Sequence, residues 1–150
     1  MNSNKWDRRY LDLAQHVSTW SRDPSTKCGA VITKNNRVVS IGFNGIPTGL
    51  DDEKYLHPRE TKIACVLHSE VNAILTSNVP LADSTLYVNG APCSNCAATM
   101  IQVGIKRVVM PPVDFEFAKR WNWHLSEQMF NDASVEITIL EDENEQKDLS

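Results

Sequence analysis

Two cysteines and one histidine stand at spacings that suit a metal site. Cys93 and Cys96 are separated by two residues and lie after a proline and before a run of small, helix-forming residues. In a reducing compartment, such a pair is typical of a redox dithiol, of half a structural zinc site or of a catalytic metal site. Upstream, His68 lies two residues before Glu70 at the start of another helical run. His68, Cys93 and Cys96 supply the Cys₂His ligand set of a catalytic zinc site, in which water takes the fourth position.

Glu70 distinguishes the kinds of zinc site. A structural site is closed by four protein ligands, whereas a hydrolytic site needs a base beside its water. Cys65 is an alternative fourth ligand, but it lies in the apolar run IACVL, which favours a buried thiol. Cys28, in KCGAVI, has the same interpretation. The sequence therefore favours an open site with Glu70 as its base.

The elements that position these residues follow from the hydrophobic pattern. Apolar side chains recur at helical spacing in residues 4–20. The β-rich stretches 28–34 and 37–43 flank Asn35-Asn36, a pattern that predicts a hairpin. The later elements are expected in this order: helix 66–78, strand 84–89, helix 93–104, strand 105–110, helix 125–133 and strand 134–140. This alternation predicts an α/β fold, a three-layer α/β/α sandwich around a five-stranded mixed sheet.

Two other segments are set apart by their composition. Residues 44–62 are punctuated by Gly and Pro and form a long connection, which in a compact domain is often functional. The last ten residues hold five acidic residues and one lysine, which account for the whole net charge of −4. We expect a single domain over residues 1–140 and a flexible acidic tail over 141–150.

Composition excludes several classes of partner and location. The rest of the chain is near neutral and has no basic stripe, so nucleic acid is not an expected partner. No apolar run is long enough to span a bilayer, and the first residues lack the apolar core of a signal peptide. We therefore expect a cytoplasmic protein with no membrane partner.

The metal motifs resemble those of a known family. His68-Ser69-Glu70 and Pro92-Cys93-Ser94-Asn95-Cys96 resemble the signature of the zinc-dependent cytidine and nucleotide deaminases, and the likeness extends from about residue 23 to 109. The stretches RDPSTKCGAVI, GFNGIPTG and HSEVNAI resemble the deoxycytidylate (dCMP) deaminase branch of that family. Two features depart from the pattern: Ser69 replaces the usual alanine, and residues 111–128 do not resemble the tail of that branch.

The resemblance implies a fold, a reaction and a cofactor. The fold is expected to be cytidine deaminase-like, with Zn²⁺ held by His68, Cys93 and Cys96. The expected reaction is hydrolytic deamination of a free pyrimidine deoxynucleotide, dCMP to dUMP and ammonia, by zinc-activated hydroxide with Glu70 as proton shuttle. A homo-oligomer, hexamer or dimer, and regulation by dCTP and dTTP are also implied.

Substrate contacts are assigned partly by resemblance. The resemblance implies that Asn44 binds the sugar and that the backbone of Ala30 and Ala64 lies near the base. A monophosphate needs a cationic or amide-rich cradle, and the turn after the first helix offers one. The candidates in that turn are Arg22, Ser25, Thr26 and Lys27.

Two alternatives remain open at this point. A related deaminase acting on another nucleotide, on a nucleoside or on a base leaves that turn without a phosphate to bind. A non-catalytic zinc module predicts a closed site and a dispensable Glu70. The aromatic residues of segment 115–124 are candidates for stacking on a base or for a subunit contact, and the subunit contact is favoured because aromatic side chains are enriched there.

Overall fold

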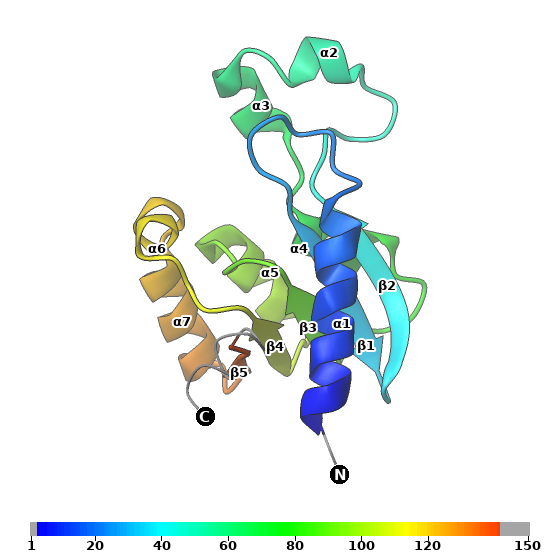
Figure 1. Cartoon of the computed structure of the whole chain (residues 1–150), viewed down its shortest axis with the longest axis vertical. Coiled ribbons are helices and arrows are strands. Elements are labelled where there is room, and N and C mark those ends of the chain that lie inside the picture. The colour runs from blue at the N-terminus through cyan, green and yellow to red at the C-terminus, as the bar shows by residue number, and fades with distance from the viewer. Residues whose placement is uncertain (1–2, 142–150) are drawn as a thin grey trace.

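A five-stranded mixed sheet forms the centre of the molecule, with the strand order β2-β1-β3-β4-β5 (Figure 1). The computed structural model describes residues 3–141. The strands are β1 (Gly29–Lys34), β2 (Arg37–Phe43), β3 (Thr85–Val88), β4 (Arg107–Met110) and β5 (Glu136–Ile139). β1 pairs antiparallel with β2 and β3, whereas β3, β4 and β5 run parallel. The prediction of a five-stranded mixed sheet is confirmed.

The hairpin between β1 and β2 turns at Asn35 and Asn36, as predicted. Both residues have positive φ, 54° and 58°. Asparagine tolerates this left-handed conformation better than most residues, and a two-residue hairpin turn of type I′ requires it at both positions. Lys34 pairs with Arg37 across the turn.

Helices cover both faces of the sheet and complete the predicted three layers. The longer helices are α1 (Ser3–Ser18), α4 (Ser69–Thr76), α5 (Ser94–Val103) and α7 (Trp123–Asp132). α1 packs on one face against β1 and β3, and α4 packs against β1 and β2 (Figure 1). α5 contacts both α4 and α7. α5 is followed by Gly104, the predicted end of this helix, whose φ of 94° is the left-handed conformation of a glycine cap.

Alternating side chains of the strands divide the core in two. Val31 of β1 and Tyr87 of β3 pack with α1, while their neighbours Ile32 and Leu86 pack with the cluster beneath α4, α5 and α7. This alternation follows from the two-residue period of a strand. Both faces are buried, so the central strands have few exposed positions.

Three short helices lie where the sequence predicts a loop or an unassigned segment. α2 (Asp52–Tyr55) and α3 (Arg59–Cys65) interrupt the 44–62 connection and lie at the upper end of the molecule in Figure 1. α6 (Phe115–Trp121) lies between β4 and α7. α2 is too short for a hydrophobic period. α2 and α6 each begin at an aspartate side chain that accepts from a backbone N–H two residues later.

The aromatic residues of segment 115–124 lie in different surroundings. Trp123 is buried against Phe130 inside this chain, so the expected subunit contact is wrong for Trp123.

Among residues 3–141, no helix has the length and apolar character needed to cross a bilayer. Positions 142–150 of the predicted acidic tail lie outside the described residues.

Candidate functional site

Three ligand atoms meet where two helices begin. His68 is the N-cap residue of α4, and Cys93 is the N-cap residue of α5, with Cys96 in the first turn of that helix. His68 Nδ1 lies 3.4 Å from Cys93 Sγ and 3.2 Å from Cys96 Sγ. Tetrahedral zinc with ordinary bond lengths separates such atoms by about 3.5 Å. The donor set and its spacing therefore fit zinc.

The cluster has three protein ligands. Among residues 3–141, His68, Cys93 and Cys96 are the only group of potential ligands whose atoms lie within 4.8 Å of one another. Cys65 is half-buried at the end of α3 and is not part of the group. The closed site with Cys65 as fourth ligand is therefore not formed, and one position is left for water.

The protonation states of the two thiols and the imidazole depend on one another. The hydrogen bond between the thiols lowers the pKa of Cys93 to about 4 and raises the pKa of Cys96. The hydrogen bond between Cys93 and His68 raises the pKa of the imidazole. Zinc takes thiolates and neutral imidazole, so its binding at this cluster releases protons.

Glu70 lies beside the cluster with its carboxyl buried. The residue is 5% exposed, and the Ser69 hydroxyl donates to Glu70 Oε1 over 2.7 Å. Burial raises the pKa of Glu70, although the Ser69 hydrogen bond and His68 oppose this effect. A carboxyl of this kind exchanges protons closer to neutral pH, as a general acid and base requires.

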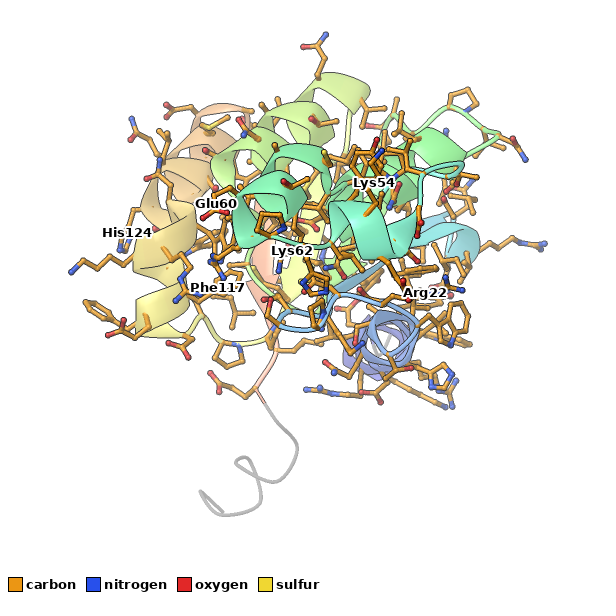
Figure 2. All side chains as sticks on the ribbon, turned by 90° about the horizontal axis from the view of Figure 1, so that it is seen from above. Arg22, Lys54, Glu60, Lys62, Phe117 and His124 are labelled. Atoms are coloured by element: carbon orange, nitrogen blue, oxygen red, sulfur yellow. The ribbon has the colours of Figure 1, made fainter. Side chains whose placement is uncertain are left out.

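A cleft opens from the cluster toward solvent. His68, Glu70 and Cys93 line its inner end, and α3, α6 and the turn after α1 form its walls. Trp121 of α6 meets the His68 ring edge-on, with ring centroids 5.8 Å apart and planes at 89°. Figure 2 labels Lys62 of α3 and Phe117 of α6, which both line this cleft.

The structure separates the predicted substrate contacts into two groups. Ser25, Thr26 and Asn44 line the cleft. The other four do not: Arg22, Lys27, Ala30 and Ala64. Arg22 is exposed and pairs with Asp52 over 2.8 Å, away from the cleft (Figure 2), and the Lys27 ammonium donates to the Ser21 carbonyl. Ala30 is fully buried in β1, and Ala64 is exposed on α3.

The Asn44 side chain is bonded to the backbone. Its Oδ1 accepts from the Cys28 N–H over 2.9 Å, and its Nδ2 donates to the Thr26 carbonyl over 2.9 Å. An amide nitrogen carries two hydrogens. Asn44 therefore holds the cleft wall in place and retains one donor for a ligand.

The sequence-based assignment missed the cations of the cleft. Arg59 and Lys62 come from α3, and Arg120 comes from α6. Lys62 is buried, and its ammonium donates to Asp23 Oδ1 over 3.1 Å and to Ser25 Oγ over 2.7 Å. The signal that could have identified them is the spacing i, i+3, i+4, which recurs on α3 with Ile63 and on α6 with Phe117 and Trp121.

Comparison with known proteins matches most of the chain to one family model. Residues 4–111 match the cytidine and deoxycytidylate deaminase zinc-binding region. An uncharacterised deaminase from the luxG 3′ region of Aliivibrio fischeri is 45% identical over 139 residues, which cover 91% of this chain and 95% of that protein. Human deoxycytidylate deaminase is 34% identical over 113 residues, covering 70% of this chain and 64% of the human protein.

A solved structure matches the fold. The dCMP deaminase of cyanophage S-TIM5, in complex with dCMP and dUMP, has a TM-score of 0.73. The match covers 93% of this chain and 99% of the phage protein at 23% sequence identity. At this identity the likeness supports the fold.

Proposed function

The chain belongs to the family of zinc-binding cytidine and deoxycytidylate deaminases, and we propose that it converts dCMP to dUMP and ammonia. Family membership confirms the predicted deaminase activity and the predicted zinc cofactor. Family membership does not identify the substrate. One observation carries the proposed substrate: the buried acid-base group and two arginines, Arg59 and Arg120, line a single cleft.

Glu70 is the proton carrier in this proposal. It accepts a proton from the attacking water and delivers it to N3 of the pyrimidine while the oxygen adds to C4. It then takes the remaining proton of that oxygen and passes it to the amino group, so that the C4–N bond breaks, the C4 carbonyl forms and ammonia leaves. When bound at His68, Cys93 and Cys96, zinc supplies the Lewis acidity that makes water nucleophilic at neutral pH. The raised pKa of the buried carboxyl suits both transfers.

The cations of the cleft favour a phosphorylated substrate. Arg59 of α3 and Arg120 of α6 line the cleft, as do Ser25 and Thr26 of the turn after α1. Guanidinium groups bind phosphate oxygens through charge-assisted hydrogen bonds. We therefore assign the 5′-phosphate to these residues and not to Arg22 or Lys27, whose side chains contact Asp52 and Ser21.

A nucleoside deaminase is the strongest competing function. Such an enzyme needs no cation at the mouth of the cleft, so Arg59 and Arg120 would have no ligand there. A non-catalytic zinc module has no use for a buried acid beside three ligands. Both alternatives leave part of the cleft unexplained.

The test is a substrate panel. Ammonia release by the zinc-loaded protein is measured with dCMP, deoxycytidine, CMP and dCTP at equal concentrations. We expect dCMP to have the highest kcat/KM and deoxycytidine to be poorer by at least about a hundredfold, because it lacks the phosphate that two arginines bind. Equal turnover of deoxycytidine and dCMP would contradict the phosphate assignment, and turnover of none of the four would overturn the substrate.

A further inference from the structure

The backbone just before β1 is held by asparagines on both sides. β1 lies between β2 and β3 in the sheet, and each of these strands ends where β1 begins. Asn44 directly follows β2, and Asn89 directly follows β3. We call these two residues the asparagine clamp.

The two asparagines bind the same segment in the same way. Asn44 Oδ1 accepts from the Cys28 N–H, its own N–H donates to the Cys28 carbonyl, and its Nδ2 donates to the Thr26 carbonyl. Asn89 repeats the pattern one residue later. Its Oδ1 accepts from the Gly29 N–H over 2.9 Å, its N–H donates to the Gly29 carbonyl over 3.3 Å, and its Nδ2 donates to the Lys27 carbonyl over 3.2 Å.

This arrangement follows from the geometry of an extended chain. Successive residues of a strand direct their N–H and C=O groups to opposite edges. Residues 26 and 28 therefore face Asn44, and residues 27 and 29 face Asn89. Side-chain amides continue the ladder past the ends of β2 and β3, so the segment stays extended without a neighbouring strand.

The clamp also connects the segment to both halves of the metal cluster. After Asn44, Gly45 pairs with Leu67 through two backbone hydrogen bonds of 3.1 and 2.8 Å, and Leu67 immediately precedes His68. After Asn89, Gly90 and Ala91 line the cleft and lead to Cys93. Thr26 and Cys28, within the held segment, line the same cleft. One extended segment is thus attached to the chain on the histidine side and on the cysteine side.

We propose that Asn89, acting with Asn44, is a positioning residue for deamination. It sets the distance between the cleft wall at Thr26 and Cys28 and the loop that carries Cys93. Its loss should impair substrate binding and metal retention together, because both depend on the same spacing.

The test compares Asn89→Ala with Asn89→Asp and Tyr87→Phe. Asn89→Ala removes both side-chain bonds, while Asn89→Asp keeps an oxygen that accepts from the Gly29 N–H. Tyr87→Phe is the matched control: it lies two residues earlier, on the α1 side of β3, and loses one buried hydrogen bond, to Asp7. KM for dCMP, zinc loss to EDTA and Tm are measured for all three.

We expect Asn89→Ala to raise KM at least about tenfold and to release zinc at least about tenfold faster than the wild type. Asn89→Asp should fall between the wild type and Asn89→Ala, and it carries the test if the alanine variant does not fold. Tyr87→Phe should lower Tm and leave KM and zinc release unchanged. Asn89 variants that change Tm alone, like the control, would overturn the proposal.

The KM measurement rests on the proposed function, whereas zinc release does not. If the wild type fails to turn over dCMP, the proposed substrate is wrong, and the rate of zinc release still tests the role of Asn89. If the wild type is active and the Asn89 variants match it in zinc release and in KM for dCMP, only the proposed role of Asn89 is wrong.

Discussion

At the scale of single residues, the cleft holds two thiols of opposite character. The pKa of Cys93 is lowered to about 4 by its hydrogen bond with Cys96, which suits a metal ligand. Burial raises the pKa of Cys28 to about 12, and the charges of Glu70 and Asp23 add to this effect. Cys28 is therefore a neutral thiol in the wall of the cleft across the physiological range.

We predict that Cys28 resists alkylation at neutral pH. Only thiolate reacts quickly with iodoacetamide, and a pKa of about 12 leaves almost none at pH 8. Modification of the zinc-loaded protein, followed by mass spectrometry of the peptide containing Cys28, should show slow labelling at pH 8 that accelerates as pH rises toward 11. Rapid labelling at pH 7 would contradict the burial of this thiol. Cys28→Ser identifies the peptide signal.

At the scale of elements, α3 and α6 contribute to the cleft with the same spacing. Arg59, Lys62 and Ile63 occupy positions i, i+3 and i+4 of α3, and Phe117, Arg120 and Trp121 do so on α6. Residues at these positions share one face of a helix. Each helix therefore contributes apolar side chains and an arginine to the same cleft.

Replacement of either arginine should weaken phosphate binding selectively. For Arg59→Ala and Arg120→Ala we expect KM for dCMP to rise about tenfold, since one charge-assisted hydrogen bond in an exposed setting is worth about 1.5 kcal/mol. Activity on deoxycytidine, which has no phosphate, should not change. Arg22→Ala is the control, because Arg22 pairs with Asp52 outside the cleft. If Arg22→Ala raised KM for dCMP as much as the other two substitutions, the assignment of the phosphate to Arg59 and Arg120 would be contradicted.

The contact between β2 and α4 positions the residues that carry the chemistry, and it depends on Gly42. A Cβ there would lie 2.4 Å from the Ala73 backbone nitrogen and 2.6 Å from the Ser69 carbonyl oxygen, inside α4. We predict that Gly42→Ala lowers the free energy of unfolding by about 2 kcal/mol or more, as measured by denaturant titration. Gly45→Ala, whose Cβ would meet nothing within 4 Å, should change it by less than about 0.5 kcal/mol. Equal effects would contradict the close packing.

At the scale of the whole molecule, one buried ion pair links distant parts of the chain. Asp23 and Lys62 lie in the turn after α1 and in α3, with side chains 4% and 10% exposed. Burial opposes ionisation of Asp23, but hydrogen bonds from the Ser25 and Thr26 N–H groups and from Lys62 outweigh it and lower its pKa. The pair therefore stabilises the molecule above the ordinary aspartate pKa, and this stability is lost as pH falls through the lower native value.

We predict that Asp23→Asn makes the free energy of unfolding depend less on pH between pH 7 and pH 3. At pH 7 the variant should be less stable by about 3 kcal/mol, because it leaves Lys62 buried without a counter-ion. The difference from the wild type should narrow below about pH 4. Urea unfolding at several pH values measures this, with the exposed Asp132→Asn as control. A constant difference between pH 7 and pH 3 would contradict the account.

The sequence predicted local features better than distant ones. The metal residues were predicted because they lie in two short motifs of distinctive residue types, although His68 and Cys93 are 25 residues apart. The Asn35-Asn36 turn was predicted because its conformation depends on neighbours in sequence. The helical spacing places Lys62 on one face of α3, but its partner Asp23 is 39 residues away and is not visible in that pattern. Asn89, whose partner Gly29 is 60 residues away, carries no local signal. Arg22 was assigned to phosphate from its place in a polar turn, and only tertiary structure shows that it faces Asp52. The homo-oligomer and its response to dCTP or dTTP stay predictions.

In the proposed mechanism Glu70 carries the protons of the deamination, and Glu70→Gln tests this role. Glutamine keeps the size of the side chain and cannot exchange a proton. The zinc content of the variant is measured first, and then its turnover of dCMP to dUMP. We predict one zinc per chain and a kcat lower by about a thousandfold or more, as expected for loss of a general acid and base. A zinc-loaded variant that turns over dCMP within about tenfold of the wild type would contradict the claim.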